Sequence, residues 1–372
     1  MRPKLRGFVV PGRLAARQDG VRLIEIGLVG CGRIAQLVHL RELGSLSGLR
    51  LTALAEPDPD RLSRAAALAP GARQYADYHD LLGQQSVDAV ILSLSPDLHA
   101  DAAIASFEAG KHVYLEKPLA TDLESADDVL EAHKRAGLVG MMGFNFRFHP
   151  SYRLIRKLLA EGAIGDVVAL RTAFSSVRRS LPAWKKSRGT GGGVLLDLGS
   201  HHIDILRFVT SAEVSEVSAR IRSQRSEADT ALLQLKLTSG LEVQSFFSLT
   251  GVAEDLFEAI GENGKLSFER YTNRFTKRPE VLPTARAKVL RRESSHFTRA
   301  LRGIWQKVEE PSFRNAFDAF AHAIEGDSKE IPTLEDGYRC LEVVDAAERS
   351  AASGRVTRLP ERGRHAVGTG PP

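Results

Sequence analysis

The segment from Gly191 to Asp204, GGGVLLDLGSHHID, carries three ionisable side chains at helical spacing. If a helix begins after the glycines, Asp197, His201 and Asp204 stand at i, i+4 and i+7 and fall on one narrow stripe. The residues around them are mostly apolar, which predicts that the helix enters the interior. A buried carboxylate–imidazole–carboxylate stripe is costly unless its members pair or meet a ligand. The segment therefore predicts an acid/base site, and a satisfied structural hydrogen-bond network is the alternative.

A glycine-rich turn early in the chain predicts a nucleotide-binding site. Residues 23–29 are typical of a short apolar strand, and residues 30–35 follow at once with the pattern G-x-G-x-x-A. The first glycine permits a tight turn, the second lets the backbone approach a pyrophosphate, and the small third residue allows close packing of helix on strand. The helix that continues from the turn offers its N-terminal N–H groups to the phosphates. The cofactor contacts expected from this turn are Gly30, Gly32, Arg33 and Ile34.

The second expected strand, 51–55, ends at Glu56, which lies 21 positions beyond Ala35. An acidic residue at this place suits the two ribose hydroxyls of NAD and repels the 2′-phosphate of NADP. The sequence therefore predicts NAD as the cofactor. Arg61 lies close enough in the sequence to leave NADP open.

The alternation of strands and helices continues as in a parallel α/β sheet. Residues 87–94 form a nearly continuous apolar run, typical of a parallel strand that is covered on both faces. Ligands of such sheets bind beyond the carboxyl ends of the strands, where Lys117 falls after the next strand, 111–115. Pro118 favours an extended conformation for Lys117, which could present its ammonium group to a reacting oxygen. An ordinary surface lysine before a loop is the alternative.

Several runs in the second half of the chain are typical of strands bounded by turn signals. They cluster without intervening helices, which predicts an antiparallel sheet and an α+β domain, unlike the first half. Two later segments, 313–324 and 334–353, have apolar residues at helical spacing and are expected to pack as helices. The expected strands are 167–174, 216–223, 231–238, 242–249, 256–260 and 265–269.

Together these segments resemble the glucose–fructose oxidoreductase / inositol dehydrogenase / rhizopine catabolism family, written Gfo/Idh/MocA, from about residue 23 to about residue 359. The matching features occur along the chain in the family's order. They are the turn at 30–35, the acidic strand end at Glu56, Ser95-Pro96 with His99, the E-K-P motif Glu116-Lys117-Pro118, the junction segment 145–150, the glycines 191–193 with Asp197, Gly199 and His201, and the closing loop and helix at 331–337.

The resemblance implies an α/β Rossmann dinucleotide-binding domain followed by an α+β domain with a mainly antiparallel, open-faced sheet. That sheet often serves as the subunit interface, which implies a homodimer or homotetramer. The family's catalytic set corresponds to Lys117, Asp197 and His201. Further cofactor contacts are expected at Ser95, Pro96, His99, Glu116 and Lys117, and substrate contacts at Lys117, Arg147, Asp197 and His201.

We expect hydride transfer between nicotinamide and a secondary alcohol of a sugar, cyclitol or sugar derivative, including nucleotide-linked sugars. His201 would take the hydroxyl proton, since imidazole has an ordinary pKa of about 6.5, and Lys117 would stabilise the developing alkoxide. Asp197 would orient the imidazole or bind a neighbouring hydroxyl, whereas Asp204 is either structural or a substrate contact. The alternatives are an enzyme that keeps NAD(H) bound and cycles it, and a non-catalytic dinucleotide-binding sensor.

A metal site must also be weighed, because Asp197, His201 and Asp204 could ligate a cation at helical spacing. The sequence has no H-E-x-x-H motif and no cluster of cysteines, which are common patterns of catalytic zinc sites. Hydride transfer needs no metal when a lysine supplies the positive charge. We therefore predict no metal in the site.

Basic residues gather directly before Gly191 and again between residues 270 and 302. Such runs are usually solvated surface. In the alternative interpretation, the first cluster forms a loop over the active site and meets an anionic substrate such as a phosphorylated or nucleotide-linked sugar. The first cluster consists of Arg178, Arg179, Lys185, Lys186 and Arg188.

The composition bounds the class of protein. The 372 residues are 43% hydrophobic and 26% charged with a formal net charge of +5, which is typical of a soluble enzyme and gives little support for nucleic-acid binding. No run of 18 apolar residues occurs, so no membrane span is expected. Cys31 and Cys340 lie far apart, which predicts free thiols in a reducing cytoplasm.

We expect four segments along the chain. They are an N-terminal extension (1–22), the NAD(P)-binding domain (23–146), the substrate-binding and oligomerisation domain (147–359) and an unstructured tail (360–372). The first 22 residues contain five arginines and one lysine but lack the apolar stretch of a signal peptide. They are either a disordered extension or the result of a start codon placed too early, with Val21 as an alternative start.

Overall fold

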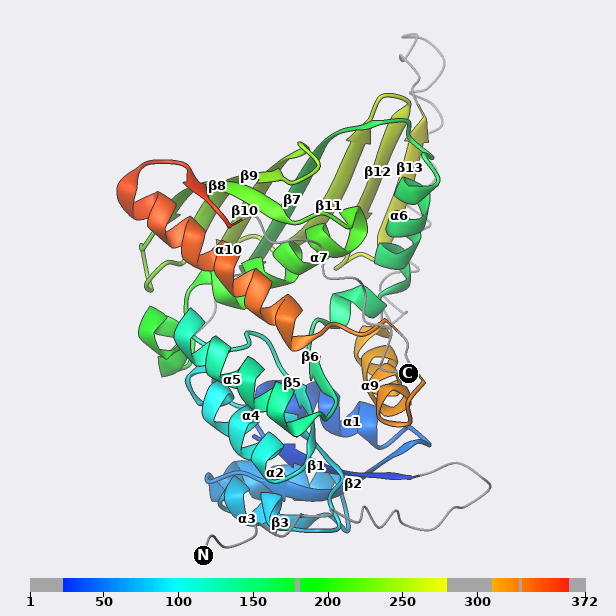
Figure 1. The fold of residues 1–372 in the computed structure, drawn as a ribbon, viewed down its shortest axis with the longest axis vertical. Helices are drawn as coiled ribbons and strands as arrows, with labels where there is room; N and C mark the ends of the chain where they lie inside the picture. Colours follow the sequence, from blue (N-terminus) through cyan, green and yellow to red (C-terminus); the bar gives the residue numbers. More distant parts are fainter. Residues whose placement is uncertain (1–22, 178–180, 280–309, 328–329, 361–372) are drawn as a thin grey trace, which may run out of the picture.

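The computed structural model describes residues 23–177, 181–279, 310–327 and 330–360. Two sheet-based halves are stacked along the long axis of the molecule, the first at the bottom of Figure 1 and the second at the top. Several expectations fall outside the described residues: the extension 1–22, the tail beyond residue 360, Arg178 and Arg179, and residues 280–302 of the second basic run.

A six-stranded parallel sheet forms the first half. The strand order is β3-β2-β1-β4-β5-β6, and every neighbouring pair is parallel. This is the Rossmann order, in which ligands bind beyond the carboxyl ends of the strands where the order reverses, between β1 and β4. The strands are β1 (Ile24–Val29), β2 (Leu49–Ala55), β3 (Arg73–Tyr75), β4 (Ala89–Leu92), β5 (His112–Leu115) and β6 (Gly140–Met142).

Helices cover both faces of this sheet, which explains why β1 and β4 are buried along their whole length and why β4 is entirely apolar. One face packs against α3, α4 and α5, and the other packs against α1, α2 and α9. The bounds are α1 (Leu40–Leu43), α2 (Pro59–Leu68), α3 (Tyr78–Leu82), α4 (His99–Glu108), α5 (Leu123–Ala136) and α9 (Ser312–Ile324).

Helix α9 departs from the expected domain division. It lies in the sequence range 147–359 that was assigned to the second domain, but it packs on the first sheet. Phe317 and Phe320 contact the ring of Tyr114 in β5, with ring centroids 5.0 and 5.8 Å away. The apolar face of α9 therefore completes the core of the dinucleotide-binding half, and the two halves share the late part of the chain.

An eight-stranded sheet forms the second half, in the order β13-β12-β11-β7-β10-β9-β8-β14. All neighbouring pairs are antiparallel except β7 and β10. The six expected strands are all present, and β13 and β14 were missed because neither has an apolar alternation. The strands are β7 (Val167–Val177), β8 (Val214–Arg222), β9 (Thr230–Leu237), β10 (Glu242–Gly251), β11 (Glu254–Gly261), β12 (Gly264–Glu269), β13 (Arg274–Pro279) and β14 (Thr357–Arg358).

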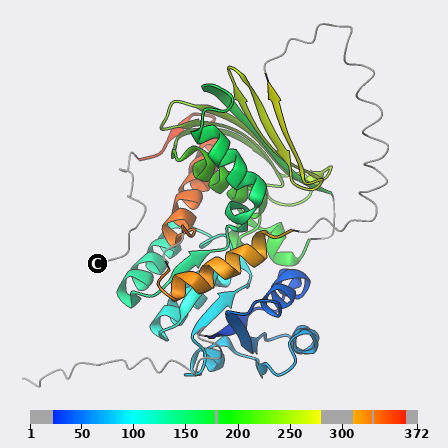
Figure 2. The ribbon, with the colours of Figure 1, turned by 90° about the vertical axis from the view of Figure 1, so that its right-hand side faces the viewer.

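Helices α6 (Pro150–Ala160), α7 (Ser200–Thr210) and α10 (Leu334–Ser353) lie on one side of this second sheet, as Figure 2 shows. Among the described residues, no helix lies on the opposite face. Helix α10 runs from the junction of the two halves along β8. It begins with a capping box between Thr333 and Asp336 and ends at Gly354, whose φ is +67°. The helices expected at 313–324 and 334–353 are thus confirmed.

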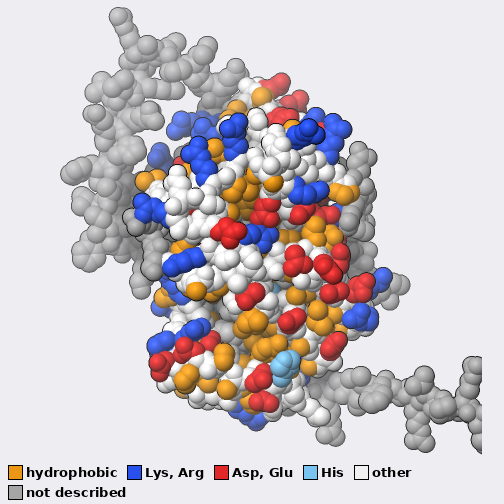
Figure 3. Space-filling view, turned by 90° about the vertical axis from the view of Figure 1, so that its left-hand side faces the viewer, with side chains coloured by type: hydrophobic (Ala, Val, Ile, Leu, Met, Phe, Trp, Pro, Cys, Tyr) orange, Lys and Arg blue, Asp and Glu red, His pale blue; other side chains and the backbone are white. Residues whose placement is uncertain are grey.

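The surface carries charges of both signs. On the face seen in Figure 3, basic and acidic side chains are interspersed with apolar ones. Within the described ranges, no helix is both long and apolar enough to cross a membrane.

Candidate active site

The glycine-rich turn has the geometry that a pyrophosphate requires. Gly30 has a φ of +88°, and a Cβ at this position would lie 2.4 Å from the carbonyl oxygen of Ser93, so only glycine fits. Nothing lies within 4 Å of the place where Gly32 would carry a Cβ, which leaves its backbone open. Arg33 and Ile34 follow as exposed residues at the beginning of the helix. The turn therefore fits a dinucleotide.

Glu56 stands beside this turn at the end of β2. Its carboxylate accepts hydrogen bonds from the backbone N–H groups of Cys31 (2.8 Å) and Asp58 (3.2 Å), and Arg61 lies 3.5 Å away. Glu56 thus connects the phosphate turn to the strand where a ribose is expected. Burial and the Glu56 charge raise the pKa of the Cys31 thiol to about 12, so Cys31 is a space-filling thiol and not a nucleophile.

The glycines before Asp197 allow the loop to pack tightly against the first domain. Gly191 has a φ of +84°, and a Cβ there would lie 2.3 Å from the Cβ of Pro96. A Cβ on Gly192 would lie 2.5 Å from the carbonyl oxygen of Ser187. Pro96, which we expected at the cofactor, is buried by this loop. Together these contacts bring the beginning of the Asp197 helix to the carboxyl ends of the parallel strands.

The single stripe of Asp197, His201 and Asp204 is wrong. Residues Leu195–Gly199 (η6) form a π turn before α7 begins, with i→i+5 hydrogen bonding. One extra residue in a turn rotates all later side chains by roughly 100° relative to an unbroken α-helix. As a result, Asp197 and Asp204 point to different partners. Asp197 meets lysines, and Asp204 meets arginines.

Two lysines from different parts of the chain converge on Asp197. Lys185 Nζ lies 2.7 Å from both carboxylate oxygens, and Lys117 Nζ lies 3.5 Å from Oδ1 and donates to the Asp197 carbonyl oxygen at 2.5 Å. Burial raises the pKa of Asp197, but the charges of Lys185 and Lys117 outweigh it and hold the pKa below its ordinary value. Burial lowers the pKa of Lys117, and Asp197 opposes this shift. The cluster carries one net positive charge.

His201 is held by aromatic rings. Its imidazole stacks on Phe146, with ring centroids 4.4 Å apart and planes at 16°, and Phe174 lies 6.3 Å away. The buried Nδ1 atom has no hydrogen-bond partner among the described residues. Burial, and then the charges of Lys117 and Arg270, hold the pKa of His201 well below 6.5. Asp197 acts on the imidazole through its charge, which raises the pKa of His201 and partly offsets these effects.

His99 and Glu116 fix the E-K-P loop, of which Glu116 is the first residue. The ring nitrogens of His99 lie 2.6 Å from the carbonyl oxygen of Pro118 and 3.2 Å from that of Leu94. Both ring nitrogens of His99, an expected cofactor contact, therefore face backbone carbonyl oxygens. The contact with Pro118 positions the loop that carries Lys117. Glu116 Oε1 lies 3.0 Å from Nε2 of the buried His39, which follows the phosphate turn. Ser95 precedes the short 3₁₀ turn Pro96–Leu98 and is partly buried.

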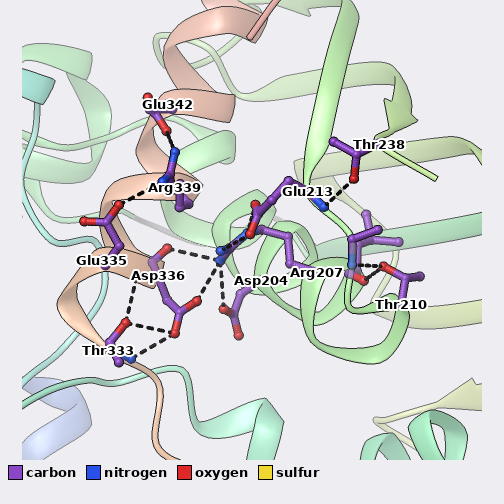
Figure 4. A network of polar contacts seen from close by, with 12 residues as sticks. Asp204, Arg207, Thr210, Glu213, Thr238, Thr333, Glu335, Asp336, Arg339 and Glu342 are labelled. Carbon is purple, nitrogen blue, oxygen red and sulfur yellow. Dashed lines mark hydrogen bonds and ion pairs between the residues drawn. The ribbon is translucent and has the colours of Figure 1, made fainter. Parts of the chain in front are cut away.

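Arg147 is not brought to the Lys117–Asp197 cluster. Its guanidinium binds both carboxylate oxygens of Asp204, with Nε distances of 3.0 and 2.8 Å, and Nη1 donates to Asp336 at 3.1 Å. Arg207 also contacts Asp336 at 3.1 Å and binds Glu213 at 2.6 Å. Figure 4 shows Asp204, Arg207 and Asp336 converging between α7 and the beginning of α10. Asp336 therefore serves both as the helix-capping residue and as a partner of two buried arginines.

Sequence reasoning missed two partners of the site. Lys185 belongs to a basic run that was expected to be solvated surface, with a loop over the active site as the alternative, and its pairing with Asp197 was not predicted. Arg270 was placed in a basic run, yet it is largely buried and binds Asp255 at 2.6 Å. The signal for Arg270 was weak, because a single arginine at a strand end is usually exposed. Arg188 anchors the loop of Lys185 through Glu348, at 2.5 and 3.1 Å.

The carboxylates of Asp197 and Asp204 both pair with cationic side chains. Within the residues that the structure describes, no group of three or more histidine, cysteine, aspartate or glutamate side chains could hold a metal ion. The absence of a catalytic metal remains a prediction.

Comparison with protein families matches residues 24–144 to the oxidoreductase family with an NAD-binding Rossmann fold, and residues 152–267 to the GFO/IDH/MocA C-terminal domain. Inositol 2-dehydrogenase 2 of Saccharopolyspora erythraea is 32% identical over 342 residues, covering 89% of this chain and 94% of that protein.

Solved structures agree with this match. The WlbA dehydrogenase of Bordetella pertussis, in complex with NADH and UDP-GlcNAcA, has a TM-score of 0.77 at 25% identity, covering 92% of this chain and 100% of that one. KijD10, a 3-ketoreductase of Actinomadura kijaniata in complex with NADP and TDP-benzene, has a TM-score of 0.74 at 25% identity, covering 88% and 98%. The expected fold class is confirmed, and the chain belongs to the Gfo/Idh/MocA family of NAD(P)-dependent oxidoreductases.

Proposed function

We propose that this protein transfers hydride between a nicotinamide and a secondary alcohol of a sugar, cyclitol or sugar derivative. The observation that carries the proposal is the meeting of Lys117, from the first half, with Asp197 and the adjacent His201 helix turn, from the second. The names of the relatives support this substrate class, since one is an inositol dehydrogenase and another was solved with a nucleotide sugar.

In this mechanism the chain's own residues handle the proton and the charge. His201 is uncharged at neutral pH because burial and nearby cations lower its pKa, so it can accept the hydroxyl proton. Lys117 donates a hydrogen bond to the same oxygen and stabilises the developing alkoxide. Asp197 holds Lys117 in place and keeps it protonated against the effect of burial. The nicotinamide, when bound, accepts the hydride from the carbon.

NAD is the proposed cofactor. Glu56 and Asp58 place two carboxylates beside the expected ribose position, where they would repel a 2′-phosphate. Arg61 pairs with both of them, at 3.5 and 3.3 Å, so its charge is already compensated. We expect a higher kcat/KM with NAD than with NADP. The Glu56→Ala variant should lower the ratio of kcat/KM with NAD to kcat/KM with NADP. An equal or inverse preference in the wild type would refute the assignment.

The substrate class is tested by nicotinamide reduction across inositols, free sugars, sugar phosphates and nucleotide sugars, with NAD and NADP in parallel. We expect one group of substrates to give turnover that is abolished in His201→Ala. Turnover that persists in that variant would refute the role of His201. If no substrate of the panel gives turnover while the dinucleotide still binds, two alternatives remain: an enzyme that keeps NAD(H) bound and a non-catalytic sensor. Acid extraction of the purified protein separates them, because stoichiometric NADH indicates a permanently bound cofactor.

We also infer that the open face of the second sheet forms a homodimer or homotetramer interface. A hollow of about 600 Å³ lies on that face, and its lining includes the exposed Leu232 together with Phe246 and Leu256. Apolar side chains on an uncovered sheet favour association. Light scattering should give a dimer or tetramer, and Leu232→Asp should shift it toward the monomer. A wild-type monomer would contradict this inference.

Both cysteines are free and buried, which supports a reducing cytoplasm as the compartment. Fractionation of cells that express the tagged chain tests this placement, and recovery outside the cytoplasm would contradict it.

A further inference from the structure

The mechanism above leaves a buried arginine without a role. Arg270 directly follows β12, and only 15% of its side chain is exposed. Its guanidinium donates to Asp255 Oδ2 at 2.6 Å and to Glu310 Oε2 at 3.0 Å. Two carboxylates on one guanidinium compensate its charge and fix its plane. Such an arrangement is rigid, and it lies next to the proposed general base.

Arg270 reaches His201 through an aromatic ring. Its guanidinium carbon lies 4.4 Å from the centroid of the Phe146 ring, and the imidazole of His201 stacks on that same ring at 4.4 Å. Phe174 makes a second bridge, since it lies 5.7 Å from the guanidinium of Arg270 and 6.3 Å from the imidazole. The three planar groups Arg270, Phe146 and His201 form a contiguous set, called here the Arg270 stack.

A second connection runs through the neighbouring residue on α7. Asp255, which holds Arg270, also lies 3.0 Å from Nε2 of His202, and both side chains are fully buried. His202 in turn stacks on Phe174 at 5.3 Å. The helix turn that carries His201 is therefore fixed from two directions, and both connections begin at Arg270 or its carboxylate partner.

The charges around the imidazole come from several elements. Lys117, Arg270 and His202 lower the pKa of His201, Asp197 raises it, and burial adds the largest lowering. Arg270 is in turn balanced by Asp255 and Glu310. A guanidinium near the ring disfavours the imidazolium form and thereby keeps the base ready to accept a proton.

We propose that Arg270 is a positioning residue for the proposed reaction, which fixes the plane of the His201 imidazole through the ring of Phe146. The role of His201 as the base rests on the proposed function; the stack and its effect on His201 do not. Arginine suits this task better than lysine, because a planar guanidinium can stack on a ring and bind two carboxylates at once.

Two variants separate the charge of Arg270 from its shape. Arg270→Met removes the charge, and Arg270→Lys keeps the charge but loses the planar stacking group. Arg207→Lys is the matched control, since Arg207 is also largely buried and paired with carboxylates but lies in the Asp336 network. Thermal unfolding establishes which variants fold, and Phe146→Leu replaces Arg270→Met if the latter does not.

The primary readout is the titration of the His201 ring by NMR of histidine-labelled protein, with its signal assigned from His201→Gln. We expect the pKa of His201 to rise by about one unit in Arg270→Met, and by less in Arg270→Lys. Turnover in Arg270→Lys should fall about tenfold with a small change in KM, whereas Arg207→Lys changes neither quantity. Unchanged titration and turnover in the folded Arg270 and Phe146 variants would overturn the proposal.

This titration needs no substrate, so the two proposals can fail separately. A wild-type protein that is inactive on every substrate, yet shows the expected shift in His201, would refute the proposed function and leave the Arg270 stack standing. An active enzyme in which His201 titrates identically with and without Arg270 would refute the Arg270 stack and leave the proposed function standing.

Discussion

Asp197 and Asp204 lie on the same helical run, but their surroundings differ in kind. Asp197 is bound by Lys117 and Lys185, which come from different elements and keep 14% and 19% of their side chains exposed. Asp204 is bound by Arg147 through both carboxylate oxygens, and only 1% of its side chain is exposed. Asp197 lies in the π turn Leu195–Gly199 and Asp204 in the α-helix that follows, and the two carboxylates point to different clusters.

The difference shows how one helix can serve both chemistry and stability. Lysine carries a compact charge on a flexible side chain, and its pKa shifts readily. These properties suit a group that hydrogen-bonds an oxygen whose charge changes during the reaction. Arginine stays charged and binds carboxylates in a fixed geometry, which suits a buried junction. We therefore propose that the Lys117–Asp197 cluster serves catalysis and that the Arg147–Asp204 cluster holds α7 against α10.

The largest expected effect is on stability, at the arginine cluster. Arg147→Met removes the main partner of the buried Asp204 and should lower the free energy of unfolding by about 3–5 kcal/mol. Chemical denaturation measures this loss. The folded fraction should keep its KM, because the guanidinium is fully engaged by Asp204 and Asp336. A raised KM at unchanged stability would instead restore the expectation that Arg147 binds substrate.

The second effect is on turnover, at the lysine cluster. Lys117→Met and His201→Gln should each lower kcat by roughly 100-fold or more, the usual scale for acid/base groups. Their unfolding free energies should change far less than that of Arg147→Met. Steady-state kinetics and denaturation on the same preparations test both parts. If both variants turn over normally, the assignment of the cluster to catalysis is wrong.

The pH dependence sharpens the comparison, because only one cluster contains a titrating base. The pKa of His201 lies well below 6.5, so the rate of alcohol oxidation should stay constant down to pH 6.5 and fall only at lower pH. Protonation is disfavoured in the folded state, so acid below pH 6.5 also lowers stability. The pKa of Lys117 lies below 10.5, so the alkaline decline should begin below that pH. An acid limb above pH 6.5 in the kcat/KM profile would contradict these directions.

The smallest expected effect concerns Lys185, which pairs with Asp197 from the short 3₁₀ turn Ala183–Lys186. Lys185→Met should lower kcat by only a few-fold, because Lys117 remains in contact with Asp197. If the substrate is anionic, the same variant should raise KM more than it lowers kcat. Comparison of one anionic and one neutral substrate decides this point. Equal changes in KM for both would leave Lys185 as a partner of Asp197 alone.

The sequence was sufficient to predict the two-half architecture, because apolar runs and glycine turns are local signals. The predictions of a phosphate turn at 30–35, of Glu56 and of the E-K-P lysine rest on the same kind of local signal. The stripe failed because a π turn has no signature in periodicity. Arg147 was misplaced because its partners Asp204 and Asp336 are 57 and 189 residues away. The roles of Lys185 and Arg270 depend on such long-range pairing and could not be found locally.

The central claim is that Asp197 serves chemistry and Asp204 serves stability, although the two occupy one helical run. The most direct test measures kcat and the free energy of unfolding for Asp197→Asn and Asp204→Asn in parallel. The account predicts that Asp197→Asn loses turnover with a small loss of stability, and that Asp204→Asn loses stability while its folded fraction turns over normally. If both variants lost turnover and stability in the same proportion, the division of roles between Asp197 and Asp204 would be contradicted.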